Sequence, residues 1–191
     1  MRLYHVSKIP NLKILEPHLS THKKPYVYAT TNLEFALFFG GIESAGDFDG
    51  IYGLKDGTPF FYEAYEGALQ RRFGETTCYI YEVDPTTFEK DKTSFKGEVV
   101  SEKPVNTINC EKIDNLYQYL LKLNDNGKIQ LHFFEDTKEY KEMIDNHILD
   151  RISRFGIIKN KNSDIYKFCE KHFRHLLEEF VIEDNKNEHM I

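Results

Sequence analysis

The sequence contains no tryptophan, and its three cysteines follow no recognisable pattern. Cys78, Cys110 and Cys169 are far apart and lack the CxxC or Cys/His spacing of a structural zinc site, so no metal is expected. An odd number of cysteines without a pairing pattern indicates a reducing compartment. The longest apolar run, residues 35–39, has five residues, whereas a membrane helix needs about 20. Since the N-terminus also lacks the apolar stretch of a signal peptide, the sequence predicts a cytoplasmic protein without a membrane partner.

The usual nucleotide and hydrolase motifs are missing as well. The sequence contains no GxGxxG, GxxxxGK[ST], HExxH or GxSxG. This argues against the usual dinucleotide-binding folds and against P-loop NTPases. The pair Gly40-Gly41 is better interpreted as the end of a helix than as a phosphate-binding loop.

The charge balance disfavours nucleic acid as a partner. The chain has 191 residues, with 31 acidic against 25 basic side chains and a net charge of −6. Non-specific nucleic-acid binding needs an excess of Lys and Arg, because affinity comes from counterion release. The length suits one domain, or one domain with an appendage, and such a chain buries about 70% of its unfolded surface. The 12 Tyr and 15 Phe residues supply large side chains for that core.

The chain divides into two differently patterned parts, predicted as residues 1–108 and 109–191. The first part carries short runs rich in Tyr, Val, Ile and Phe, which are typical of strands. The predicted strands are Arg2–Val6, Tyr26–Ala29, Phe60–Tyr65, Cys78–Val83 and Glu98–Ser101. One helix, capped by Thr31 or Asn32 and ending at Gly40-Gly41, interrupts them.

The second part follows a helical period. The predicted helices start behind Asn109, at the box Asp136-x-x-Glu139 and near Ser163, with one short strand-like stretch at residues 129–134. Strands first and helices later predict an α+β fold. The apolar stripes of the helices need burial, and packing on the β-rich part is favoured over a partner protein.

The first 40 residues and one later strand carry the informative motifs. Leu3-Tyr-His-Val-Ser7 ends a strand with His and Ser, and Tyr26-Val-Tyr-Ala-Thr30 feeds a short apolar helix. Lys96-Gly-Glu-Val-Val-Ser101 starts a strand with Glu. In this order the three segments resemble the His-Tyr-Glu signature of the ADP-ribosyltransferase superfamily, in the branch of diphtheria toxin and poly(ADP-ribose) polymerases. The resemblance covers roughly residues 2–106.

The resemblance implies a split antiparallel β-sheet core, NAD as the substrate and ADP-ribose transfer to an unknown protein or small-molecule acceptor. It implies that Glu98 stabilises the oxocarbenium-like ribose formed when the nicotinamide bond breaks. His5 would bind the ribose on the adenosine side, and Tyr28, with Phe38, would stack on nicotinamide. The backbone of Val6 would hold the carboxamide, and the hydroxyl of Ser7 would hold the carboxamide or a hydroxyl group.

The assignment of the acidic residue and of the acceptor site stays open. Glu102 lies four residues beyond Glu98 and is the alternative acid. The acceptor-side loop implied by the family corresponds to residues 91–97, where Phe95 has the character of a recognition residue.

A non-catalytic module that binds NAD, ADP-ribose or a protein is the alternative function. It is motivated by Val6, where the family has Gly, and by Phe35, where the family often has Ser. A third possibility, an RNA 2′-phosphotransferase of the same fold, ranks low because the Arg residues of that family's motifs have no match in this chain.

Overall fold

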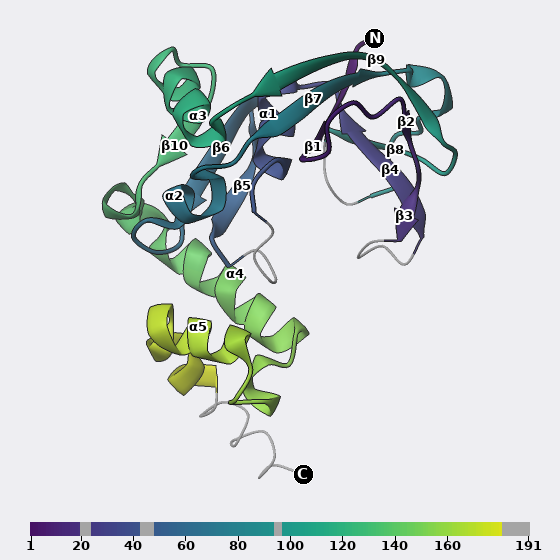
Figure 1. Cartoon of the computed structure of the whole chain (residues 1–191). Coiled ribbons are helices and arrows are strands. Elements are labelled where there is room, and N and C mark those ends of the chain that lie inside the picture. The colour runs from purple at the N-terminus through teal and green to yellow at the C-terminus, as the bar shows by residue number, and fades with distance from the viewer. Residues whose placement is uncertain (20–23, 43–47, 94–96, 181–191) are drawn as a thin grey trace. The chain divides into compact units, whose positions relative to one another are not determined.

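The computed structural model describes residues 1–19, 24–42, 48–93 and 97–180. The defined strand pairs of its larger sheet are all antiparallel, and helices dominate the later part of the chain. Figure 1 shows that this sheet is strongly curled. A mixed α and β class with an antiparallel sheet is therefore confirmed. The candidate residue Phe95 and the charged C-terminal tail lie outside the described residues.

The elements alternate irregularly along the chain. The strands are β1 (Leu3–Ser7), β2 (Ile14–Leu15), β3 (His18–Leu19), β4 (Pro25–Thr30), β5 (Gly50–Lys55), β6 (Thr58–Glu63), β7 (Cys78–Val83), β8 (Glu98–Ser101), β9 (Val105–Ile113) and β10 (Gln130–His132). The α-helices are α1 (Leu33–Ala36), α2 (Ala68–Phe73), α3 (Leu116–Asp125), α4 (Lys141–Arg154) and α5 (Asp164–His172), and residues 174–180 are also helical. The 3₁₀ segments are η1 (Leu37–Phe39), η2 (Pro85–Thr87), η3 (Phe134–Tyr140) and η4 (Ile157–Lys159).

The larger sheet has seven strands in the order β2-β9-β7-β1-β4-β3, with β8 paired to β4. Because side chains alternate between the two faces of a strand, one set of them forms a buried cluster on one face of this sheet. The buried cluster on that face comprises Leu3, Leu15, Val27, Ala29, Tyr81, Val83, Val99 and Val105. A second sheet has the order β10-β6-β5.

The described chain clusters into two compact units. Among the described residues, one comprises 1–19, 24–42, 52–61, 69–93 and 97–131, and the other comprises 48–51, 62–68 and 132–180. All seven strands of the larger sheet belong to the first unit. Residue 108, after which the sequence pattern changes, lies within β9.

The helix predicted behind Asn109 begins later than expected. Residues 109–113 instead pair with β7, with Cys110 opposite Tyr81 and Ile113 opposite Cys78. The helix α3 starts at Leu116, where the side chain of Asn115 accepts a hydrogen bond from the backbone N–H of Gln118. The prediction was wrong because strand pairing, a long-range interaction, overrode the local helical period.

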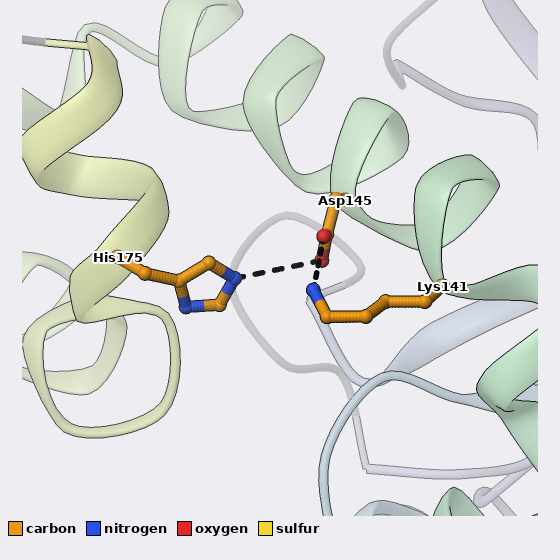
Figure 2. Close-up of polar contacts among 3 residues, drawn as sticks. All are labelled: Lys141, Asp145 and His175. Atoms are coloured by element: carbon orange, nitrogen blue, oxygen red, sulfur yellow. Dashed lines mark hydrogen bonds and ion pairs between the residues drawn. The ribbon is translucent and has the colours of Figure 1, made fainter.

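The second unit is built on the helical stripes that the sequence predicts, although α4 begins at Lys141 and not behind Asp136. Ile144, Ile148 and Ile152 are buried on one face of α4. Figure 2 shows the carboxylate of Asp145 on α4 between the ammonium of Lys141 and the ring of His175, whose Nε2 lies 3.6 Å from Asp145 Oδ1. These side chains are partly exposed, so the contacts contribute little to stability.

None of the helices in the described ranges is both long and apolar enough to span a membrane.

A test of the packing in the first unit is the substitution Gly40→Ala. An added Cβ would lie 2.8 Å from Val6 Cγ1, 3.1 Å from Leu116 Cδ2 and 3.2 Å from Cys78 Sγ. Because overpacking a core costs about 1–3 kcal/mol, we expect a loss of unfolding free energy in this range. Urea denaturation measures it. The matched control is the double variant Val6→Ala/Gly40→Ala, in which the smaller Val6 replacement leaves room for the methyl group. If the loss of unfolding free energy in the double variant equals the sum of the losses in Val6→Ala and Gly40→Ala, the packing described here is contradicted.

Candidate functional site

The three strands that carry His5, Tyr28 and Glu98 are neighbours in the sheet. Strand β4 pairs with β1 through Tyr4 opposite Thr30, and with β8 through Thr30 opposite Glu98. Segments from the start and from the middle of the sequence therefore meet on the two sides of β4. This adjacency is what a shared site requires, and the linear sequence does not contain it.

The side chain of His5 forms a hydrogen bond with the backbone of Tyr28. His5 Nδ1 lies 2.8 Å from the carbonyl oxygen of Tyr28. A carbonyl oxygen only accepts, so Nδ1 carries the proton and donates. In the neutral ring this leaves Nε2 as an acceptor, which suits a hydroxyl donor such as a ribose O–H.

The environment of His5 favours the neutral ring. Burial is the main cause that lowers the pKa of His5 below its ordinary value of 6.5. The hydrogen bond to the Tyr28 carbonyl acts in the opposite direction, and the nearby His18 lowers the pKa further. The ring is therefore neutral at pH 7, in the tautomer that the contact with Tyr28 selects.

The side chains of Tyr28 and Glu98 share one face of the sheet. Tyr28 is opposite Val100 and Thr30 is opposite Glu98, and residues two apart on a strand point to the same side. Tyr28 also makes an edge-to-face contact with Tyr26, with ring centroids 5.8 Å apart. His5 follows Tyr4 by one residue, so its side chain leaves β1 on the other face and reaches β4 through the Tyr28 carbonyl.

The alternative acid, Glu102, is placed differently. It follows the end of β8, is exposed, and its carboxylate lies 3.7 Å from the ammonium of Lys24. Glu98 is only partly exposed and belongs to the strand that pairs with Tyr28 and Thr30. Placement therefore favours Glu98 over Glu102 as the acid of a site on β4.

Val6 and Ser7 serve the local structure of β1. Val6 is buried, and its Cγ1 is close to Gly40 on the side that also contains Cys78 and Leu116. The hydroxyl oxygen of Ser7 accepts a hydrogen bond of 3.1 Å from the backbone N–H of Ile9. The extra methyl groups of Val6, relative to glycine, are thus used in packing.

The predicted second stacking residue, Phe38, is 0% exposed. Its ring contacts four other aromatic rings at centroid distances of 5.9–6.2 Å, those of Phe35, Tyr52, Phe61 and Phe73. No face of Phe38 is accessible to a ligand in this arrangement. Phe35 is fully buried in the same cluster and is therefore a core residue.

Phe39, next along the chain, is a better candidate for contact with a ligand. It is 43% exposed, and its ring lies edge-on to Phe35 at 5.2 Å and to Tyr52 at 5.8 Å. The sequence contained a partial indication that Phe39 is exposed, because this residue falls outside the helical stripe of Leu33, Ala36, Leu37 and Gly40. That stripe also excludes Phe38, so it could not show which of the two rings is buried.

Asn32 links the strand β4 to the helix behind it. Its Oδ1 accepts a 2.8 Å hydrogen bond from the N–H of Phe35, and its own N–H donates to Thr30 Oγ1 at 3.2 Å. Its Nδ2 donates to the carbonyl of Gly57 at 3.0 Å. The end of β4, beside Glu98, is therefore held to α1 and to the β5–β6 turn. Of the two predicted helix caps, Thr31 and Asn32, the structure uses Asn32.

Within the part of the chain that the structure describes, no group of three or more His, Cys, Asp or Glu side chains is placed to hold a metal ion. The cysteines Cys78, Cys110 and Cys169 are free thiols. Burial raises the pKa of Cys78 to about 11 and that of Cys169 to about 12, so neither supplies a thiolate nucleophile at neutral pH.

Comparison of the chain with protein-family models, with curated proteins and with solved structures finds no match. The function proposed below therefore rests on the resemblance of three sequence segments and on where the structure places their residues.

The lowered pKa of His5 predicts a pH dependence of stability. As the pH falls below 6.5, the unfolded chain binds a proton at this residue before the folded chain does. The stabilisation from His5 is thus complete above pH 6.5 and is lost as the pH falls through the folded pKa. As the pH falls, we expect the unfolding free energy to decrease more steeply in wild type than in His5→Asn. The difference between the two slopes should correspond to the uptake of at most one proton. Asn is the replacement because its amide can still donate to the Tyr28 carbonyl. Urea titrations at pH 5–8 measure the difference. Parallel pH profiles for the two proteins would contradict a lowered His5 pKa.

Proposed function

We propose that this chain is an NAD-dependent ADP-ribosyltransferase that cleaves the nicotinamide–ribose bond and transfers ADP-ribose to a protein or small-molecule acceptor. The observation that carries the proposal is the bond from His5 Nδ1 to the Tyr28 carbonyl at 2.8 Å, since it joins two elements of the motif that are 23 residues apart. The third element, Glu98, lies on the next strand.

Glu98 supplies the charge that this reaction needs. Breaking the glycosidic bond of NAD develops positive charge on the ribose, and a fixed carboxylate beside it stabilises the transition state. Glu98 is on the same sheet face as Tyr28, the proposed nicotinamide contact. The same carboxylate can accept a hydrogen bond from a ribose hydroxyl or a proton from the acceptor.

The two ends of NAD are assigned to different residues. Nε2 of neutral His5 accepts from a hydroxyl of the ribose on the adenosine side. The ring of Tyr28 stacks on nicotinamide, and an aromatic pair contributes about 0.5–1.5 kcal/mol beyond the buried area. We assign the second aromatic contact to Phe39, because Phe38 is buried. The backbone of Val6 binds the carboxamide, and the hydroxyl of Ser7 binds the carboxamide or a ribose hydroxyl.

The assignment of the fold follows from the same family resemblance, whereas the compartment and the acceptor are argued from the composition of the chain. The curled antiparallel sheet is interpreted as the split sheet of an ADP-ribosyltransferase fold. The free thiols of Cys78, Cys110 and Cys169 suit a reducing compartment, so we propose a cytoplasmic site of action. The net charge of −6 disfavours a nucleic-acid acceptor.

A non-catalytic module that binds NAD or ADP-ribose is the second candidate. Two observations favour it: the ring of His5 leaves β1 on the face opposite the side chains of Tyr28 and Glu98, and Phe35 is buried where the family often offers a Ser hydroxyl. Such a protein would bind NAD without releasing nicotinamide.

The substitution Glu98→Gln separates the two candidates. Purified protein is incubated with NAD, nicotinamide release is measured, and NAD binding is measured by calorimetry. Since the carboxylate acts mainly in the transition state, we expect turnover to fall by at least about 100-fold while the dissociation constant changes by less than about threefold.

The matched control is Glu102→Gln, which removes a nearby exposed carboxylate and should retain turnover within about twofold of wild type. Loss of turnover in Glu102→Gln, with Glu98→Gln active, would assign the acid to Glu102. NAD binding by wild type without nicotinamide release would select the binding module, and neither binding nor release would exclude both candidates.

A further inference from the structure

The turn that follows β1 is closed by a side chain from another strand. Residues Ile9–Leu12 have Pro10 and Asn11 at the two central positions, and Asn11 has a φ of 58°. Proline followed by a residue with positive φ is the preference of a type II β-turn. In the common form of such a turn, the first carbonyl accepts a hydrogen bond from the fourth N–H.

In this turn, the phenol of Tyr81 bridges those two backbone groups. The backbone N–H of Leu12 donates to the Tyr81 oxygen at 3.2 Å, and the Tyr81 O–H donates to the carbonyl of Ile9 at 2.7 Å. One hydroxyl therefore satisfies both ends of the turn and ties it to β7. A buried phenol needs such partners, and Tyr81 is fully buried.

Tyr81 is also the direct cross-strand neighbour of His5. The register of β1 and β7 places His5 opposite Tyr81 and Ser7 opposite Tyr79. Residues opposite each other in an antiparallel pair share a face and interact through their side chains. The ring of Tyr81 thus lies beside the imidazole that we assign to NAD, while its hydroxyl holds the turn.

The end of β1 is connected to the same turn. Ser7 Oγ accepts from the N–H of Ile9 at 3.1 Å, so the hydroxyl assigned to the ligand is hydrogen-bonded to the first residue of the turn. On the other side, Thr107 Oγ1 donates to the Leu12 carbonyl at 2.8 Å, and the N–H of Thr107 donates to the Lys13 carbonyl at 3.0 Å. The turn is therefore fixed at both ends, to β7 and to β9.

We propose that Tyr81 is a positioning residue for NAD: by closing the turn at residues 9–12 and packing beside His5, it fixes the positions at which His5 and Ser7 contact the dinucleotide. This inference rests on the proposed function. Tyr81 acts through its neighbours and touches no reacting atom, so it affects binding of substrate and transition state alike.

The test is Tyr81→Phe, which keeps the buried ring and removes the hydroxyl. We expect KM for NAD to rise about tenfold while kcat for nicotinamide release stays within about twofold, the pattern of lost uniform binding. The matched control is Tyr79→Phe, on the same strand and face, which should change neither constant. A second variant, Thr107→Val, removes the other side-chain bond to the turn and should raise KM in the same direction.

Amide hydrogen exchange of the same proteins without NAD provides a readout that does not depend on activity. In Tyr81→Phe we expect exchange of the amides of Ile9, Asn11, Leu12 and Lys13 to accelerate about tenfold, with the amides of Ile80 and Val83 unchanged. Accelerated exchange across the whole of β7 would show a general loss of stability and would overturn a positioning role.

The outcomes separate this inference from the function on which it rests. Unchanged KM in Tyr81→Phe, with an active wild type, overturns the positioning role alone, whatever the exchange shows. A fall in kcat with unchanged KM also overturns it. A wild-type protein that neither binds nor cleaves NAD overturns the proposed function and, with it, the assignment of Tyr81 to a ligand site.

Discussion

The arrangement of the candidate site depends on how β1 meets β4. Tyr4 lies opposite Thr30, and one residue farther along β1 the ring of His5 bonds to the Tyr28 carbonyl. The His5 side chain thus donates to the Tyr28 carbonyl oxygen, which in a regular sheet would accept a hydrogen bond from the backbone of a neighbouring strand. Since the same contact selects the ring tautomer, it makes His5 both a structural link and an acceptor with a defined orientation.

Three sets of neighbouring interactions hold the strands on either side of this contact. Strand β8 flanks β4 and brings Glu98 next to Thr30. Asn32 holds the end of β4 to α1 and to the β5–β6 turn. On the other side of β1, Tyr81 fills the position opposite His5 and closes the following turn. The residues proposed for chemistry are therefore placed by neighbours that are themselves hydrogen-bonded, a requirement for a preorganised site.

The sequence predicted the local elements well where one pattern dominated. β7 and β8 begin and end at the predicted residues, because an alternating or β-branched run is bounded by clear turn signals. β9 was missed since its mostly exposed and polar residues become a strand only through pairing with β7. β5 was missed although Asp56-Gly57, with φ values of 52° and 81°, is a hairpin signal visible in the sequence. The segments of Tyr28 and Glu98 were predicted as strands, but their pairing is seen only in the structure. A helical stripe likewise could not predict that Phe38 would be enclosed by rings from β5, β6 and α2.

The most direct test of the central claim is a crystal structure of Glu98→Gln soaked with NAD, in which slow turnover preserves the substrate. The account predicts nicotinamide against the ring of Tyr28 and a hydroxyl of the adenosine-side ribose within hydrogen-bond distance of His5 Nε2, with the His5 to Tyr28 contact retained. NAD bound elsewhere on the chain, or a His5 ring turned away from the Tyr28 carbonyl in the complex, would contradict it.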